Sequence, residues 1–423
     1  MVERAPFLNS VYSAYHHRGR SGEDEELTRV GPGTPCGEYL RRFWQPIVLA
    51  RELGELPRRI RILGEDLVVF RDKRGAIGLL ELHCPHRGAS LEFGLIGDMG
   101  IRCCYHGWLF DVDGTILETP GEPADSTLKD RLFHGAYPVH EHGGLVFAYM
   151  GPPDSRPPFP ILDTFQLQGY KLFARAPTVW ECNWLQVKEN SMDPAHLAFL
   201  HTLPGSEGFT ADLKELGEWD WMETPVGMVY IDTRREGDRV WVRVADFILP
   251  NIHQFPPNAD PLAQRNSINR PLATTWAVPL DDTHTMQIGY YHMPAGRELR
   301  RGAGFGQDGS RSYEERQRVP GDYDAQVSIH GGVARHGLEH LATTDRGITM
   351  MRNMIRRGIR AVRSGEHLDY PILRNGPAIP TYCHDRVISG IASAPTREED
   401  RLLLRERGRN VVEESVRVGL ATP

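Results

Sequence analysis

The chain has 423 residues, more than one hydrophobic core usually supports, so its length predicts at least two domains. A net charge of −7 argues against the basic surface that nucleic acids or anionic membranes require. No apolar run is long enough to span a membrane, and residues 1–26 lack the apolar core of a signal peptide. We therefore expect a cytoplasmic protein with an irregular N-terminal extension over residues 1–38.

Short strands separated by close turns are predicted after this extension. The apolar or alternating segments lie at residues 59–63, 66–70, 76–80 and 108–112. Turn sequences such as Asp113-Gly114 follow them. This pattern predicts a small all-β domain of antiparallel strands over residues 39–155.

A larger mixed domain is predicted for residues 156–385. Residues 151–160 contain five prolines, which neither a helix interior nor a central strand accommodates, so they are the expected linker. The second domain should contain strands at 240–244 and 285–292 and an amphipathic helix at 344–362. The predicted fold class is α+β, with an antiparallel sheet flanked by helices. Residues 386–423 form a charged C-terminal tail that should cover the surface.

Cysteine and histidine residues cluster in the first predicted domain. Cys84 and His86 form a C-x-H pair, and sixteen residues separate His86 from Cys103. The second pair consists of His106 and either Cys103 or Cys104. Six cysteines are too few for a disulfide scaffold in a chain of this length. Zinc fingers place like ligands next to each other, whereas here each segment carries one thiol and one imidazole. The arrangement favours a 2Fe–2S cluster with two cysteines on one iron and two histidines on the other.

The segments 84–90 and 103–108 together resemble a Rieske cluster-binding domain. The resemblance implies that the cluster ligands are Cys84, His86, Cys103 and His106. Related domains usually carry a proline where this chain has Cys104, so Cys104 is expected to be a small buried apolar residue.

A second candidate metal site begins at Asp193, in the sequence Asp193-Pro-Ala-His196-Leu-Ala-Phe-Leu-His201. Positions five apart in an ideal helix point about 140° from each other, so His196 and His201 can share one metal only if the helix bends or ends between them. The segment resembles the D-x2-H-x4-H iron motif of Rieske oxygenases, which implies that both histidines bind a mononuclear Fe(II). Asp193 is either an N-cap before Pro194 or, as the resemblance implies, a catalytic bridge to the cluster of a neighbouring subunit.

The carboxylate ligand of this iron should come from a distant acidic segment. Gly321-Asp322-Tyr-Asp324 is the best match to the acidic segment of the family. Asp322 is the chosen ligand and Asp324 the alternative, and both could instead be ordinary surface acids.

The resemblance extends over about residues 39–351 and is closest to the phthalate-dioxygenase-like group of α subunits that lack β subunits. It implies the terminal oxygenase of a Rieske system, a homotrimer or hexamer that receives electrons from a separate NAD(P)H-dependent reductase or a ferredoxin. The expected reaction is mono- or cis-dihydroxylation of a small aromatic compound with O2. The alternatives are O- or N-demethylation and, in another class, electron transfer without catalysis.

Overall fold

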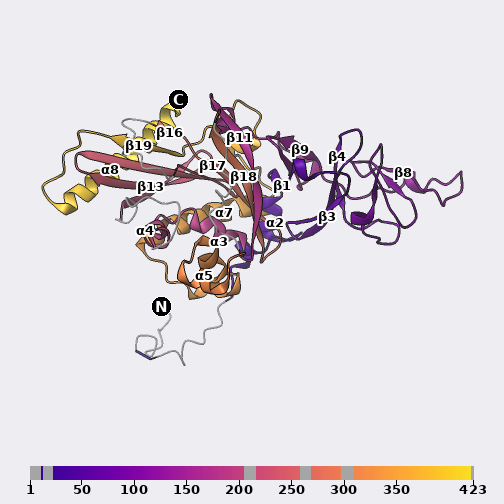
Figure 1. The fold of residues 1–423 in the computed structure, drawn as a ribbon, viewed down its shortest axis with the longest axis horizontal. Coiled ribbons are helices and arrows are strands. Elements are labelled where there is room, and N and C mark those ends of the chain that lie inside the picture. Colours follow the sequence, from indigo (N-terminus) through magenta and orange to yellow (C-terminus); the bar gives the residue numbers. More distant parts are fainter. Residues whose placement is uncertain (1–10, 13–21, 204–215, 258–267, 297–308, 421–423) are drawn as a thin grey trace.

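The computed structural model describes residues 11–12, 22–203, 216–257, 268–296 and 309–420. They form an elongated molecule with a small β-rich part at one end and a larger part, built on a wide sheet, at the other (Figure 1). None of the helices in these ranges is both long and apolar enough to cross a membrane.

The small part contains three antiparallel sheets, as the sequence predicted. The first consists of β2 (Arg58–Ile62), β3 (Glu65–Arg71) and β4 (Ile77–Glu81), and the second of β5 (Leu95–Ile96), β6 (Ile101–Arg102), β7 (Leu109–Phe110) and β8 (Ile116–Glu118). The third, which adjoins the large part, consists of β1 (Gln45–Leu49), β9 (Val139–His142) and β10 (Leu145–Ala148). β7 ends earlier than predicted because a turn begins at Asp111, whose carbonyl accepts the Gly114 N–H at 3.1 Å.

The large part is built on a nine-stranded antiparallel sheet, which confirms the predicted fold class. Seven strands follow the order β11-β18-β17-β15-β14-β13-β12, while β19 pairs with β14 and β16 pairs with β19. Their bounds are β11 (Tyr170–Trp180), β12 (Glu218–Thr224), β13 (Gly227–Glu236), β14 (Arg239–Ile248), β15 (Ile252–Phe255), β16 (Ile268–Asn269), β17 (Ala273–Pro279), β18 (Thr285–Pro294) and β19 (His384–Ile388).

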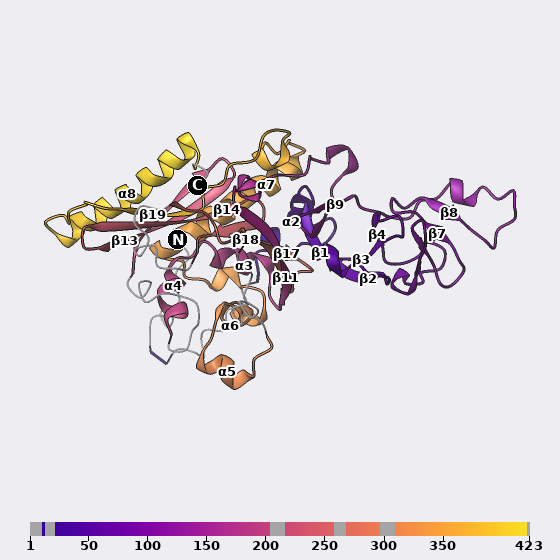
Figure 2. The same cartoon turned by 45° about the horizontal axis from the view of Figure 1, so that its top comes forward.

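Helices flank this sheet. The predicted amphipathic helix is confirmed as α7 (Arg346–Ser364), which buries Met351, Ile355 and Ile359. The other helices are α1 (Glu25–Thr28), α2 (Pro35–Leu40), α3 (Trp184–Asn190), α4 (Ala195–Phe199), α5 (Tyr313–Arg318), α6 (Asp322–Val327) and α8 (Arg397–Val418). α8 packs along β12, β13 and β14 and, as predicted for the C-terminal segment, covers the outer surface of the sheet (Figure 2).

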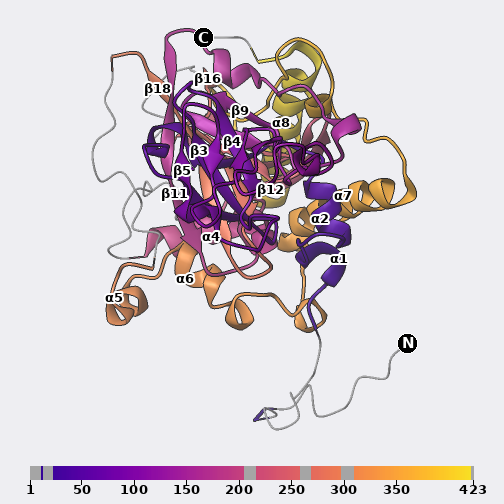
Figure 3. The ribbon, with the colours of Figure 1, turned by 90° about the vertical axis from the view of Figure 1, so that its right-hand side faces the viewer.

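The prediction of an irregular N-terminal extension over residues 1–38 is wrong for residues 25–28 and 35–38, which belong to α1 and α2. α1 and α2 lie beside α7 (Figure 3), and Leu27 and Cys36 are fully buried in the main core. The sequence around these short helices is rich in charged residues, so it gave no sign that one face is buried. The burial results from contact with α7, which is distant in sequence. The domain bounds remain a prediction, and β19, which continues to Ile388, would extend the second domain slightly beyond residue 385.

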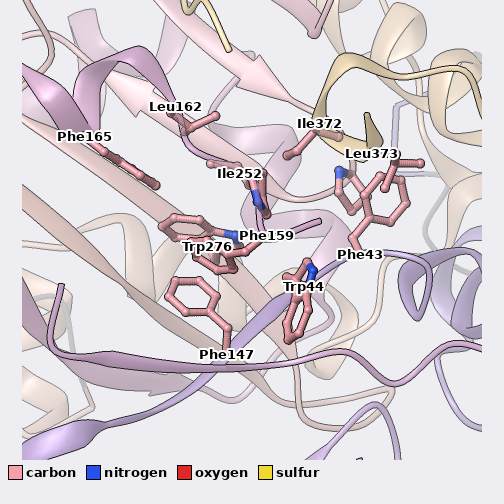
Figure 4. A pocket seen from close by; sticks show the side chains of 12 residues that line it. Phe43, Trp44, Phe147, Phe159, Leu162, Phe165, Ile252, Trp276, Ile372 and Leu373 are labelled. Atoms are coloured by element: carbon pink, nitrogen blue, oxygen red, sulfur yellow. The ribbon is translucent and has the colours of Figure 1, made fainter. Parts of the chain in front are cut away.

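Aromatic side chains fill the junction between the two parts (Figure 4). Phe147 of the small part lies 5.6 Å from Trp276 of the sheet and 4.9 Å from Phe159, measured between ring centroids. Phe159 comes from the proline-rich linker, so the linker packs into the junction. The cavity left among these rings is only about 10 Å³, too small for a ligand. The junction is therefore a packed connection between domains.

Candidate metal centres

Two similar tight turns carry the Cys/His pairs of the small part. The Cys84 N–H donates to the Ala89 carbonyl at 2.9 Å, and the Cys103 N–H donates to the Trp108 carbonyl at 2.8 Å. In each turn the glycine four residues after the cysteine has φ of +76°, a conformation that favours glycine. The matching glycines are Gly88 and Gly107. The two segments are therefore folded alike and present their side chains to a common point.

The donor set at this point suits a 2Fe–2S cluster. Cys84 and Cys103 are buried beside each other, whereas the rings of His86 and His106 are exposed, with centroids 4.5 Å apart. Two thiols on the inner side and two imidazoles on the outer side match a cluster with one iron ligated by each pair. Burial raises the pKa of Cys84 to about 11, while backbone N–H groups of His86 and Arg87 oppose the shift. A bound metal would be needed to hold this thiol deprotonated at neutral pH.

The expectation that Cys104 is buried is wrong. Cys104 is exposed, and Cys103 is the buried thiol beside Cys84. Consecutive residues of a tight turn point in different directions, so only one of two adjacent cysteines can face the inside. This geometry supports Cys103 over Cys104 as the ligand.

The two histidines of the second site lie on either side of a break in the helix, as their spacing predicted. α4 ends at Phe199, and a 3₁₀ turn, η8 (Leu200–Thr202), follows it. The break brings the rings of His196 and His201 to a centroid distance of 5.2 Å. Pro194 already has helical backbone angles, and the Asp193 carboxylate accepts the Ala195 N–H at 2.8 Å, so Asp193 caps the start of α4, which was one of its two possible roles.

Asp322, the first residue of α6, completes a group of three metal-binding side chains. Its Oδ1 lies 3.2 Å from Nε2 of His201 and 3.7 Å from Nε2 of His196. One ligand atom from each residue lies within 4.8 Å of the others. Two imidazoles and one carboxylate that converge from one side fit a mononuclear Fe(II) with open coordination positions. The donor chemistry thus suits the metal that the motif implied.

Asp324, the alternative ligand, is engaged elsewhere. Its carboxylate accepts hydrogen bonds from Arg316, from Arg311 at 2.6 Å and from the Gly321 N–H at 2.9 Å. Residues two apart on a helix point to nearly opposite sides, so α6 directs only Asp322 toward the histidines. The geometry therefore favours Asp322.

Charges within the three-residue group reinforce one another. Burial disfavours the charged form of Asp322, but the hydrogen bond from His201 and the charges of both histidines lower its pKa. Burial also opposes protonation of His196, but the hydrogen bond to Asp193 and the charge of Asp322 raise its pKa. The carboxylate is therefore held ionised, as a metal ligand must be.

Asp193 orients His196 from the side away from Asp322. The Nδ1 atom of His196 donates to the Asp193 carbonyl and lies 3.6 Å from the Asp193 carboxylate. Because a carbonyl oxygen can only accept, the proton sits on Nδ1 and leaves the Nε2 lone pair for a metal. The Asp193 carboxylate also accepts the Ala195 N–H at 2.8 Å, which holds it in place.

Asn190 is a residue of this site to which the sequence pattern assigned no role. Its side-chain nitrogen lies 3.4 Å from both Nε2 of His196 and Oδ1 of Asp322. It comes three residues before Asp193, at the end of α3. Its position just before the D-x2-H-x4-H motif could have identified Asn190 as a candidate site residue from the sequence.

Comparison with known proteins agrees with both centres. Residues 43–134 match the Rieske [2Fe-2S] domain. The chain is 42% identical to the oxygenase subunit of tert-butanol monooxygenase / tert-amyl alcohol desaturase from Aquincola tertiaricarbonis, over 95% of this chain and 91% of that protein. It is 38% identical to the α subunit of phenoxybenzoate dioxygenase from Ectopseudomonas oleovorans, over 86% of this chain and 92% of that protein.

The fold also has close counterparts among solved structures. A structure of dicamba monooxygenase bound to dicamba superposes with a TM-score of 0.61 at 20% identity, covering 77% of this chain and 99% of that one. The chain therefore belongs to the Rieske non-haem iron oxygenases, as a terminal oxygenase component with a Rieske 2Fe–2S cluster and a mononuclear non-haem iron.

Proposed function

We propose that Cys84, His86, Cys103 and His106 hold the 2Fe–2S cluster and that His196, His201 and Asp322 hold the mononuclear iron. The observation that carries the second assignment is the convergence of these three side chains from α4, η8 and α6. When bound, the mononuclear iron supplies the site at which O2 is activated. The chain supplies the orientation of each ligand, through Asp193 on His196 and through Asn190 between His196 and Asp322.

The placement of the two centres supports electron transfer between subunits. The cluster turns lie in the small part, next to β4 and β7, whereas α4 and α6, which carry two of the three ligands of the second site, lie in the large part (Figure 2). We therefore infer a homotrimer or hexamer in which the cluster of one subunit serves the iron of the next. Asp193, with a side chain 26% exposed, is the proposed link between them.

Rieske oxygenases receive electrons from a separate reductase or ferredoxin. For this chain we propose an NAD(P)H-dependent reductase as the source and a cytoplasmic location. The electron donor is expected to bring its own nucleotide site, because the G-x-G-x-x-G match at Gly304–Gly309 follows a charged segment, whereas a dinucleotide site requires a buried strand there.

The reaction we favour is mono- or cis-dihydroxylation of a small aromatic compound, in line with the phenoxybenzoate dioxygenase relative. O- or N-demethylation is the alternative within aromatic substrates. The 42% identical relative acts on tert-butanol and tert-amyl alcohol, so hydroxylation of a small tertiary alcohol is a second candidate.

Labelled oxygen separates these possibilities. The purified oxygenase with a surrogate reductase is supplied with ¹⁸O2 and either phenoxybenzoate or tert-butanol, and the product is examined by mass spectrometry. One label atom indicates monooxygenation and two indicate dioxygenation. The His201→Ala variant, which should lack the mononuclear iron but keep the cluster, is the control. Equal product from wild type and this variant would refute the proposed function.

A further inference from the structure

A buried arginine connects α7 to the end of α3, the helix that leads into the D-x2-H-x4-H motif. Arg352 of α7 is 6% exposed, and its Nε donates at 2.5 Å to the carboxylate of Glu189, the penultimate residue of α3. Its two Nη atoms donate to the two carboxylate oxygens of Glu339, at 2.6 and 3.0 Å. One guanidinium thus holds two carboxylates, and only that of Glu189 belongs to the helix beside the proposed iron site.

The Glu189 carboxylate depends on this arginine. Glu189 is 8% exposed, and within the described parts of the chain Arg352 is the only group that donates a hydrogen bond to its carboxylate. Burial raises the pKa of Glu189 to about 6, and the hydrogen bond and charge of Arg352 are the main effects that oppose this rise. A buried carboxylate without a partner is costly, so Glu189 would have to move or take up a proton if Arg352 were removed.

The last turn of α3 connects Glu189 to the proposed iron ligands. The side-chain nitrogen of the next residue, Asn190, lies 3.4 Å from both Nε2 of His196 and Oδ1 of Asp322. The Asn190 carbonyl accepts the Asp193 N–H at 3.3 Å, and the Asp193 carbonyl in turn accepts Nδ1 of His196. A displacement of Glu189 would therefore reach His196 by two routes, one through the Asn190 side chain and one through Asp193.

α7 supports the same segment at a second point. Trp221 of β12 donates from Nε1 to the Met192 carbonyl at 3.0 Å, directly before Asp193. Gly347, in the first turn of α7, lies so close to this indole that a Cβ atom would not fit. α7 itself packs against α2, β12 and β13. The end of α3 and the residue before Asp193 are thus both held against one long, well-packed helix.

We propose that Arg352 is a positioning residue for the mononuclear iron site, which holds Glu189 and the end of α3 so that Asn190 and Asp193 keep His196 in its ligating orientation. The inference rests on the proposed iron ligands and adds a residue that touches neither the metal nor the substrate. A guanidinium suits this role because its planar fork binds two carboxylates at once in a fixed geometry.

The affinity for Fe(II) in a set of variants tests this role. Protein with an intact cluster is depleted of mononuclear iron, and Fe(II) is returned anaerobically in competition with a chelator. Arg352→Met should weaken Fe(II) binding about 10-fold or more and alter the EPR spectrum of the ferrous site with nitric oxide bound, because the end of α3 is released. The visible absorption of the cluster should stay unchanged. Arg352→Lys keeps a cation beside Glu189 and should recover most of the affinity.

Glu339→Gln is the matched control, because it removes the other carboxylate that Arg352 binds and leaves Glu189 paired. It should lower the melting temperature, yet keep the wild-type EPR spectrum and an Fe(II) affinity within about twofold of wild type, because Glu339 orients no ligand. If Arg352→Met does not fold, Glu189→Leu, which leaves the arginine paired with Glu339, is expected to show the same loss of Fe(II) affinity.

Two results would overturn the positioning role alone. The first is a wild-type affinity and spectrum in Arg352→Met or, where that variant does not fold, in Glu189→Leu. The second is a loss of Fe(II) affinity in Glu339→Gln as large as in Arg352→Met, which would show a general loss of stability. A wild type that takes up no Fe(II) beyond its cluster would refute the proposed iron site as well.

Discussion

Nearby residues of the same type have different environments in this protein, as Cys103 and Cys104 and also Asp322 and Asp324 show. These environments identify one proposed ligand in each metal centre. The ligand spacing identified the first pair of segments, but it left Cys103 and Cys104 open from the residues alone. The structure buries Cys103 and exposes Cys104. Side-chain direction within a turn depends on backbone geometry that residue types do not specify, whereas Asn190 was missed although its position just before the motif could have indicated it.

Serine substitutions test the choice between the two cysteines. Cys103→Ser should abolish the visible absorption and the reduced-state EPR signal of the cluster, because a neutral hydroxyl cannot replace a thiolate ligand. Cys104→Ser should leave both signals unchanged, since that side chain faces solvent. The reverse pattern would show that Cys104 is the ligand.

Asparagine substitutions test the choice between the two aspartates. Asp322→Asn should lose most of the mononuclear iron and keep the cluster, because it removes the only carboxylate of the three-residue group. Asp324→Asn should keep the iron and instead lower stability by about 1–3 kcal/mol, because Arg311 and Arg316 lose an ionised partner. Iron analysis and thermal unfolding of both variants give the answer, and iron loss in Asp324→Asn alone would reverse the assignment.

Elements that depend on local pattern were predicted well, and elements that depend on distant contacts were not. Strand alternation identified β2, β3, β14 and β18, and the apolar periodicity identified α7. The requirement for a break between His196 and His201 followed from helix geometry and is met by the end of α4. α1 and α2 are too short to show periodicity, and their burial comes from packing on α7, more than 300 residues away in sequence.

A glycine on α7 allows this packing and can be tested. A Cβ atom added at Gly358 would lie 2.4 Å from a ring carbon of Tyr39 on α2. Gly358→Ala should therefore lower stability by about 1–3 kcal/mol, although alanine is the better helix former. Arg363→Ala, at an exposed position of the same helix, should change stability by less than about 0.5 kcal/mol in the same urea unfolding measurement. A stabilised Gly358→Ala would mean that α2 does not pack closely on α7.

At the scale of the molecule, the two proposed centres lie in different parts of one chain, and we propose that the cluster of a neighbouring subunit serves each mononuclear iron (Figure 2). A single sequence contains no direct signal of that neighbour. The aromatic junction between the parts holds them as a packed unit, which fixes where each centre is presented. The arrangement of subunits is therefore the feature that the sequence predicts least.

Substitution of Asp193 tests the proposed link between the cluster of one subunit and the mononuclear iron of the next. Asp193→Asn should keep both metal centres, because neither centre uses its carboxylate as a ligand in our assignment. It should nevertheless stop electron transfer from the reduced cluster to the mononuclear site, since the link between subunits loses its charge. Rapid mixing of the reduced variant with O2 and substrate measures cluster reoxidation, and a wild-type rate would remove the bridging role.

The claim on which the account rests is that one chain holds two different iron centres. The most direct measurement is the ratio of iron to acid-labile sulfide in fully loaded protein, for wild type and for His201→Ala. We predict about three iron ions for every two sulfide ions in wild type, and about two for every two in the variant. Equal amounts of iron and sulfide in wild type, with no change on substitution of His201, would contradict it.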